Sequence, residues 1–125
     1  DVNLGRAGDR NPDLFAEAIT QIQSVSNLPL FLDTSSIHAA EAALRVHAGK
    51  AAINSVSGQS PDHRRDHTSP GQRFKLASRY GAGVVLLAMN DDGIPDRAED
   101  RVAILMRLYE LALDVGLRPK DIVAD

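Results

Sequence analysis

The sequence contains no cysteine and no tryptophan, and it has few aromatic residues of any kind. Without cysteine the chain can form no disulfide, thiolate metal site or catalytic thiol, which fits a reducing compartment such as the cytoplasm. Its apolar runs fall well short of the ~20 residues needed to span a bilayer. The first residues also lack the basic start and apolar centre of a secretory signal. We therefore expect a cytoplasmic protein that does not engage a membrane.

A large excess of charge of one sign is also missing. Lysine and arginine total 14, aspartate and glutamate total 17, and the formal net charge over 125 residues is −3. This balance argues against a nucleic-acid-binding surface spread over the whole chain. Apolar residues make up 43% and charged residues 25%, which is typical of an ordinary globular domain rather than a disordered segment.

Short apolar runs alternate with segments of helical periodicity. The apolar runs predict strands at Asp1–Leu4, Leu30–Leu32, Ala51–Val56, Val84–Ala88 and Ile122–Ala124. The periodic segments predict helices over about 12–25, 37–48, 69–80 and 98–115. Asn11 and Ser36 are typical N-caps, and a glycine follows each of the last three helices. The buried face of the first helix is predicted to consist of Leu14, Ala18, Ile22 and Val25.

Strict alternation of strands and helices predicts an α/β fold with a parallel sheet covered by helices. Such a sheet is either open and doubly wound or closed into a (β/α)8 TIM barrel. The connection after Asn3 reads L-G-R-A-G-D-R, which is not the G-x-G-x-x-G of dinucleotide-binding sheets, and the phosphate-binding lysine loop is absent. The barrel is therefore favoured. Because a full barrel needs ~250 residues, residues 1–125 are predicted to form a partial barrel domain, about half of one.

Both ends of the sequence fall inside predicted strands, so we expect a fragment of a longer protein. An open half barrel would expose two unpaired strand edges and apolar strand faces. We therefore expect the isolated piece to be poorly stable, or to form a homodimer that closes the sheet.

A polar side chain ends each predicted strand: Asn3, Asp33, Asn54, Asn90 and Asp125. Because the carboxyl ends of barrel strands meet at one mouth, these side chains are expected to converge there. Carboxylates and amides suit a flat heterocycle with several N–H groups, since a carboxylate can accept two parallel hydrogen bonds. The alternative role for each residue is to cap the helix that follows, as Asp33 could do.

Five strings in chain order resemble the pterin-binding methyltransferase family: D-V-N-L-G, L-F-L-D-T-S-S, A-A-I-N-S-V-S-G, G-A-G-V-V-L-L-A-M-N-D-D-G-I-P and D-I-V-A-D. This family includes the folate-binding barrel of cobalamin-dependent methionine synthase and the methyltetrahydrofolate:corrinoid/iron–sulfur protein methyltransferases. The resemblance implies a pterin-binding, dihydropteroate synthase-like (β/α)8 barrel. It also implies that Asp33, Asn54 and Asp125 hold the pterin ring, with Asn3 and Asn90 lining the same mouth.

The resemblance implies a reaction as well. The N5 methyl group of methyltetrahydrofolate would pass to the Co(I) of a corrinoid, such as cobalamin, carried by a partner protein or domain. The N5 nitrogen must gain a proton or a strong hydrogen bond as its bond to carbon breaks, because a tertiary amine is a poor leaving group. No catalytic acid is assigned. Two alternatives stay open: a dihydropteroate synthase with the same Asp/Asn/Asp scheme, and a non-catalytic pterin-binding module.

Residues 58–70 form a longer connection than the resemblance implies after the I-N-S string. Within it, His63 and His67 have the spacing of a helical metal pair, but prolines flank them and no third ligand is evident. We therefore predict no metal site. Arg64 and Arg65 are instead candidates for contact with an anionic part of the folate or the corrinoid.

Overall fold

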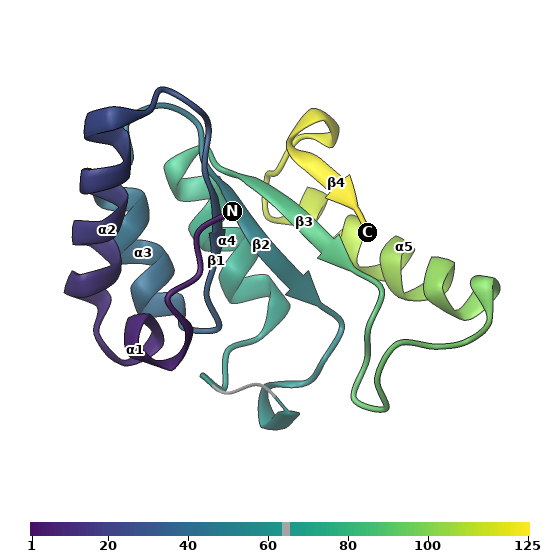
Figure 1. Cartoon of the computed structure of the whole chain (residues 1–125). Coiled ribbons are helices and arrows are strands. Elements are labelled where there is room, and N and C mark those ends of the chain that lie inside the picture. The colour runs from purple at the N-terminus through teal and green to yellow at the C-terminus, as the bar shows by residue number, and fades with distance from the viewer. Residues whose placement is uncertain (64–65) are drawn as a thin grey trace.

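Four parallel strands form one sheet in the order β1-β2-β3-β4 (Figure 1). The computed structural model describes residues 1–63 and 66–125. The strands are β1 (Phe31–Asp33), β2 (Ala52–Ser57), β3 (Gly83–Leu87) and β4 (Ile122–Ala124). All four overlap strands predicted from the apolar runs, which confirms the parallel α/β fold class.

The described residues also form five α-helices and two short 3₁₀ helices. They are α1 (Gly5–Arg10), α2 (Pro12–Val25), α3 (Ile37–Val46), η1 (Pro61–His63), α4 (Pro70–Tyr80), α5 (Ala98–Asp114) and η2 (Pro119–Asp121). The predicted caps are confirmed, because Asn11 Oδ1 accepts from the amide of Leu14 and Ser36 Oγ accepts from the amide of Ala39. Gly81 ends α4 with a φ of +66°, a left-handed conformation that suits glycine.

The strand order decides between the two closures of the sheet. In a doubly wound sheet the order reverses, and helices then cover both faces. Here each strand lies beside the one before it, and the helices pack in sequence, α2 on α3, α3 on α4 and α4 on α5. Right-handed crossovers in one direction place all the helices on the same face. The sheet is therefore singly wound, and within the described residues it has four strands and does not close.

The core lies between the sheet and this layer of helices. Phe15, Ile19, Leu32, Ile53 and Phe74 are fully buried there. On the opposite face of the sheet, no helix of the described residues covers Phe31 or Val123, which are 38% and 57% exposed. The sheet thus has one covered face and one uncovered face, and a ligand can approach the uncovered one.

The N-terminal segment differs from the prediction. Instead of a strand over Asp1–Leu4, only Val2 pairs with the sheet, through an isolated parallel bridge to Leu32. The helix α1 follows at once, in the connection after Asn3, where no helix is predicted. Its Gly8 lies so close to α2 that a Cβ there would come within 3.0 Å of the Phe15 ring. Tertiary packing of α1 on α2 therefore favours this helix in spite of its two glycines.

The predicted buried face of α2 is also wrong in part. The helix buries Phe15 and Ile19, with Ile22 packed against the core, while Val25 is 86% exposed. Leu14, at 40% exposure, also faces solvent. The helical period is therefore correct, but Phe15 and Ile19 take the buried positions predicted for Leu14 and Ala18.

A charge cluster joins β2 to β4 at the amino-terminal edge of the sheet. The buried carboxylate of Asp121 accepts a hydrogen bond from Arg118 Nε at 2.7 Å and another from Lys50 Nζ. Hydrogen bonds from Arg118 and Lys50 hold the pKa of Asp121 at about 2, below its ordinary value of 3.8. The ionised form is therefore the one that stabilises the fold.

Replacing Asp121 by Asn is expected to lower the Tm at neutral pH. Because the pKa in the folded state is depressed, the stabilisation is complete above about pH 4 and is lost as the pH falls from 3.8 toward 2. Melting the parent protein and the variant between pH 2 and pH 7 should show a difference in Tm that closes at the acid end. A difference of the same size at pH 2 and pH 7 would contradict an ionic role for Asp121.

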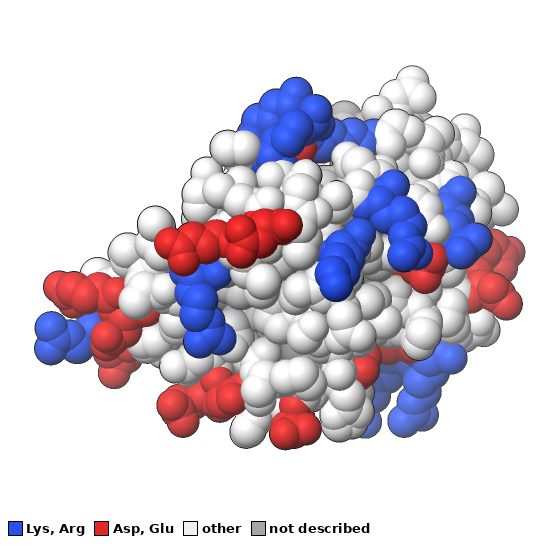
Figure 2. All heavy atoms as spheres, turned by 180° about the vertical axis from the view of Figure 1, so that it is seen from behind, with Lys and Arg blue, Asp and Glu red and all other residues white. Residues whose placement is uncertain are grey.

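The charges on the helix-covered side are mixed. Seen from behind, Lys and Arg side chains are interspersed with those of Asp and Glu (Figure 2). Across residues 1–63 and 66–125, no helix has the length and apolar character that crossing a membrane requires.

Candidate functional site

Three of the predicted site residues lie side by side at the carboxyl edge of the sheet. Strand register pairs Asp33 with Asn54, and the bridge of Val2 to Leu32 places Asn3 next to Asp33. The side chains of Asn3 and Asp33 touch, with Asn3 Nδ2 donating to Asp33 Oδ2 at 2.6 Å. The structure thus brings Asn3, Asp33 and Asn54 into one row, which we call the polar row.

The polar row points toward the uncovered face of the sheet. Side chains alternate between the two faces of a strand. Leu32 and Ile53 directly precede Asp33 and Asn54, and both are fully buried against the helices. Asp33 and Asn54 therefore point the other way, where they are only half-buried and a ligand can reach them.

Hydrogen bonds within the polar row determine which atoms are free. Asn3 Oδ1 accepts from the amide of Gly5 at 2.6 Å, so its Nδ2 is the atom directed at Asp33. Asn54 Nδ2 donates to Asp1 Oδ1 at 3.3 Å. In the part of the chain that the structure describes, no group bonds to Asp33 Oδ1 or Asn54 Oδ1. The row therefore offers two acceptor oxygens, which suit a ring edge that carries N–H groups.

Asp125 lies on the same face, across β3. Its backbone continues the pairing of β4 with β3, because its amide donates to Leu86 O at 2.9 Å and its carbonyl accepts from Ala88 N at 3.2 Å. The exposed Val123 lies on the uncovered face, so strand alternation directs Asp125 to that face as well. A second carboxylate thus lies on the same face as the polar row.

Asn90 follows β3 and is not part of the polar row. It forms a turn, because its backbone exchanges hydrogen bonds with Gly93 at 3.0 and 3.1 Å. Its Oδ1 accepts from the amide of Asp92, also at 3.0 Å, and is therefore occupied locally. The turn borders a pocket of about 400 Å³ that residues of α5 line on the other side, among them Asp100 and Ile104.

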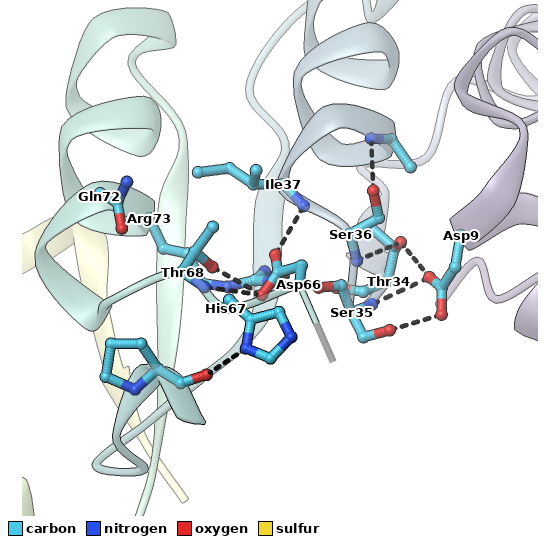
Figure 3. Close-up of polar contacts among 12 residues, drawn as sticks. Asp9, Thr34, Ser35, Ser36, Ile37, Asp66, His67, Thr68, Gln72 and Arg73 are labelled. Carbon is cyan, nitrogen blue, oxygen red and sulfur yellow. Dashed lines mark hydrogen bonds and ion pairs between the residues drawn. The ribbon is translucent and has the colours of Figure 1, made fainter. Parts of the chain in front are cut away.

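A partly buried polar network holds the loop that follows Asp33 (Figure 3). On one side, Asp9 Oδ1 accepts from Thr34 Oγ1 at 2.5 Å and from Ser35 N at 3.1 Å, and Asp9 Oδ2 accepts from Ser35 Oγ. On the other side, the guanidinium of Arg73 donates to the carbonyls of Thr34 and Ser35. Arg73 also donates to Asp66 Oδ2 at 2.7 Å.

The ionised forms of the two carboxylates in this network are stabilised. Burial alone would raise the pKa of Asp66, but hydrogen bonds from Thr68 and the charge of Arg73 outweigh it and lower the pKa. The pKa of Asp9 is likewise lowered, because bonds from Ser35 and Thr34 exceed the effect of burial. Sequence reasoning missed all three residues, since each lies far along the chain from the loop that it holds.

A pocket of about 480 Å³ lies beside this network. It is lined by Arg6, Asp9, Arg10, Ser35, Ser36 and Asp66. Neither Arg6 nor Arg10 has an ion-pair partner among residues 1–63 and 66–125. The two cations are therefore free to attract an anionic group next to the loop after Asp33.

The connection after β2 contains a Ser60, His63 and Asp91 cluster that is not a catalytic triad. Ser60 Oγ and Asp91 Oδ1 both approach His63 Nδ1, at 3.1 and 3.4 Å, whereas a proton relay needs one partner on each ring nitrogen. His67 Nδ1 contacts the carbonyl of Pro61 instead. The described residues include no group of three His, Asp or Glu that could hold a metal ion. The predicted anion contacts, Arg64 and Arg65, lie outside the described residues.

A family model described as "Pterin binding enzyme" matches residues 6–125. The matched range includes Asp33, Asn54, Asn90 and Asp125, and it begins three residues after Asn3.

Proposed function

The chain belongs to the pterin-binding enzyme family, and we propose that its ligand is methyltetrahydrofolate, with the pterin ring held by Asp33, Asn54 and Asp125. The observation that carries this proposal is the polar row, which directs free acceptor oxygens to the uncovered face of the sheet. A pterin edge carries an amino group and ring N–H donors, which such acceptors complement. Asn3 orients Asp33, and Asn90 lines the surroundings of the site.

The proposed fold around this site is a (β/α)8 barrel. The sequential strand order and the single layer of helices support it, since consecutive units of a barrel have this arrangement. In a barrel the uncovered face would become the interior, and the carboxyl edge that bears the polar row would become its mouth. Further strands would then complete the site.

The proposed reaction passes the N5 methyl group to a corrinoid that a partner protein or domain carries. The corrinoid supplies Co(I) as the nucleophile, and the pair of electrons in the carbon–nitrogen bond stays on N5, which takes up a proton. The residues of this chain bind and orient the pterin so that the methyl group faces the partner. None of them forms a covalent intermediate in this scheme, and Asp33 and Asp125 act in ring recognition.

The test is methyl transfer itself. Mixing the protein with methyltetrahydrofolate and a Co(I) corrinoid protein should release tetrahydrofolate, and omitting the corrinoid should abolish the release. Condensation of a pterin pyrophosphate with p-aminobenzoate would instead identify a dihydropteroate synthase. Binding of the pterin without either reaction would identify a non-catalytic module.

Replacing Asn54 by Ala is expected to weaken the binding of methyltetrahydrofolate about fivefold. A neutral amide contributes about 1 kcal/mol, and water can take its place at an accessible edge. Titration calorimetry on the parent and on Asn54→Ala measures the change. The matched control is Asn27→Ala, an exposed asparagine before β1 at the opposite edge, which should bind like the parent. Equal losses in both variants would mean that Asn54 has no specific role.

A further inference from the structure

The starting observation is a buried charge that does not contact the polar row. Arg73 lies on α4 and is 1% exposed, and its ion pair with Asp66 is correspondingly shielded from water. Its Nε is buried without a hydrogen-bond partner in the described residues. Burial lowers the pKa of Arg73, and the charge and hydrogen bond of Asp66 offset part of that effect. A protein is often equally stable when apolar residues of similar volume replace a buried ion pair. A contribution to net stability is therefore a poor explanation for the pair of Arg73 and Asp66.

The pair holds consecutive peptide groups of one loop. Arg73 Nη1 donates to the carbonyl of Thr34 at 3.4 Å, and Nη2 donates to the carbonyl of Ser35. Asp66 Oδ2 accepts from the amide of Ile37 at 2.9 Å. The backbone directly after Asp33 is thus fastened to a single ion pair, as Figure 3 shows.

The ion pair of Arg73 and Asp66 links the chain segments that follow Asp33 and Asn54. Asp66 belongs to the connection that follows β2, the strand of Asn54, whereas the loop that the pair holds follows Asp33. From the other side the loop is held by Asp9, on the helix that begins two residues after Asn3. The loop is therefore fixed between two charged anchors that come from the connections after Asn3 and Asn54.

We propose that Arg73 and Asp66 are positioning residues for the pterin site, because they fix the loop after β1 and so hold Asp33 in line with Asn3 and Asn54. This inference rests on the proposed function. A guanidinium suits this task because its planar fork can reach two carbonyls and a carboxylate at once. The ammonium of lysine is a point charge that cannot hold all three in the same geometry.

Replacing Arg73 by Lys tests the proposal without removing the charge. The Kd for methyltetrahydrofolate is measured by titration calorimetry at a temperature at which a thermal melt shows each variant to be folded. Arg73→Lys should weaken binding about tenfold, as expected when one charge-assisted hydrogen bond is misplaced. Asp66→Asn, which keeps an acceptor for the amide of Ile37, should weaken it in the same direction. The matched control is Arg79→Lys on the same helix, whose side chain is 69% exposed, and it should bind like the parent.

A double variant separates positioning from a general structural effect. If Arg73 acts through Asp33, the loss in Arg73→Lys combined with Asp33→Asn should be smaller than the product of the two single losses. Independent losses, or a folded Arg73→Lys that binds like the parent, would overturn the proposal while leaving the pterin site in place. A parent protein that does not bind methyltetrahydrofolate would overturn the proposed function, and this inference with it.

Discussion

Replacing Asp33 by Asn is expected to weaken the binding of methyltetrahydrofolate ten- to hundredfold. One carboxylate oxygen of Asp33 already accepts from Asn3 Nδ2 at 2.6 Å, which leaves the other for the ligand. An asparagine has only one acceptor oxygen, so it cannot serve both partners and must turn an amino group toward one of them. Hydrogen bonds to charged groups contribute about 1.5–3 kcal/mol, which corresponds to this range of affinity. Titration calorimetry of the folded variant measures it.

The matched control for this prediction is Asp114→Asn. Asp114 is an exposed carboxylate at the end of α5, and its removal changes the net charge by the same amount. The control should bind like the parent, and Asp125→Asn should show a loss of the same order as Asp33→Asn. If Asp33→Asn binds as well as the control, Asp33 does not recognise the ring.

Replacing Arg73 by Met is expected to lower the free energy of unfolding by about 3–5 kcal/mol. The change leaves Asp66 without its ionic partner in a largely buried position, and it leaves the carbonyls of Thr34 and Ser35 without their donors. Breaking a buried ion pair from one side is strongly destabilising because an uncompensated charge remains. Urea denaturation of the parent and the variant measures the loss.

Two further variants make this second prediction specific. Arg79→Met, on the exposed face of α4, should change the free energy of unfolding by less than about 0.5 kcal/mol. Adding Asp66→Asn to Arg73→Met should recover part of the stability, because no unpaired charge is then buried. A double variant less stable than Arg73→Met alone would show that the unpaired charge of Asp66 is not what destabilises Arg73→Met.

Much of the architecture could be predicted from the sequence wherever two local signals agreed. The helix α4 has a serine N-cap, a proline at its first position and a glycine at its end, and its predicted and observed bounds differ by one residue. The apolar strand before Asp33 and the one that contains Asn54 were recognised because buried parallel strands are continuously apolar. The convergence of Asn3, Asp33 and Asn54 followed from the parallel order alone, since strand ends share one edge.

Features that depend on contacts distant in sequence could not be predicted. Nothing local marks α1 as a helix or distinguishes Phe15 from Leu14 as the buried residue of α2. Both features depend on tertiary packing, in which Gly8 of α1 lies against the Phe15 ring and α2 packs on α3. Asn90 lies in a turn closed with Gly93, which a strand-end rule does not anticipate. In the sequence, Arg73 is indistinguishable from any other charged residue of an amphipathic helix. Only the fold brings it into contact with the loop after Asp33.

An NMR titration of the ¹⁵N-labelled protein with a reduced pterin tests the pterin site most directly. The account predicts that the amide shifts change chiefly at Asn3, Asp33, Asn54 and Asp125, and that the Asp33→Asn variant loses these changes at the same pterin concentration. Shifts confined to the uncovered apolar surface at Phe31 and Val123, with none at the polar row, would contradict it.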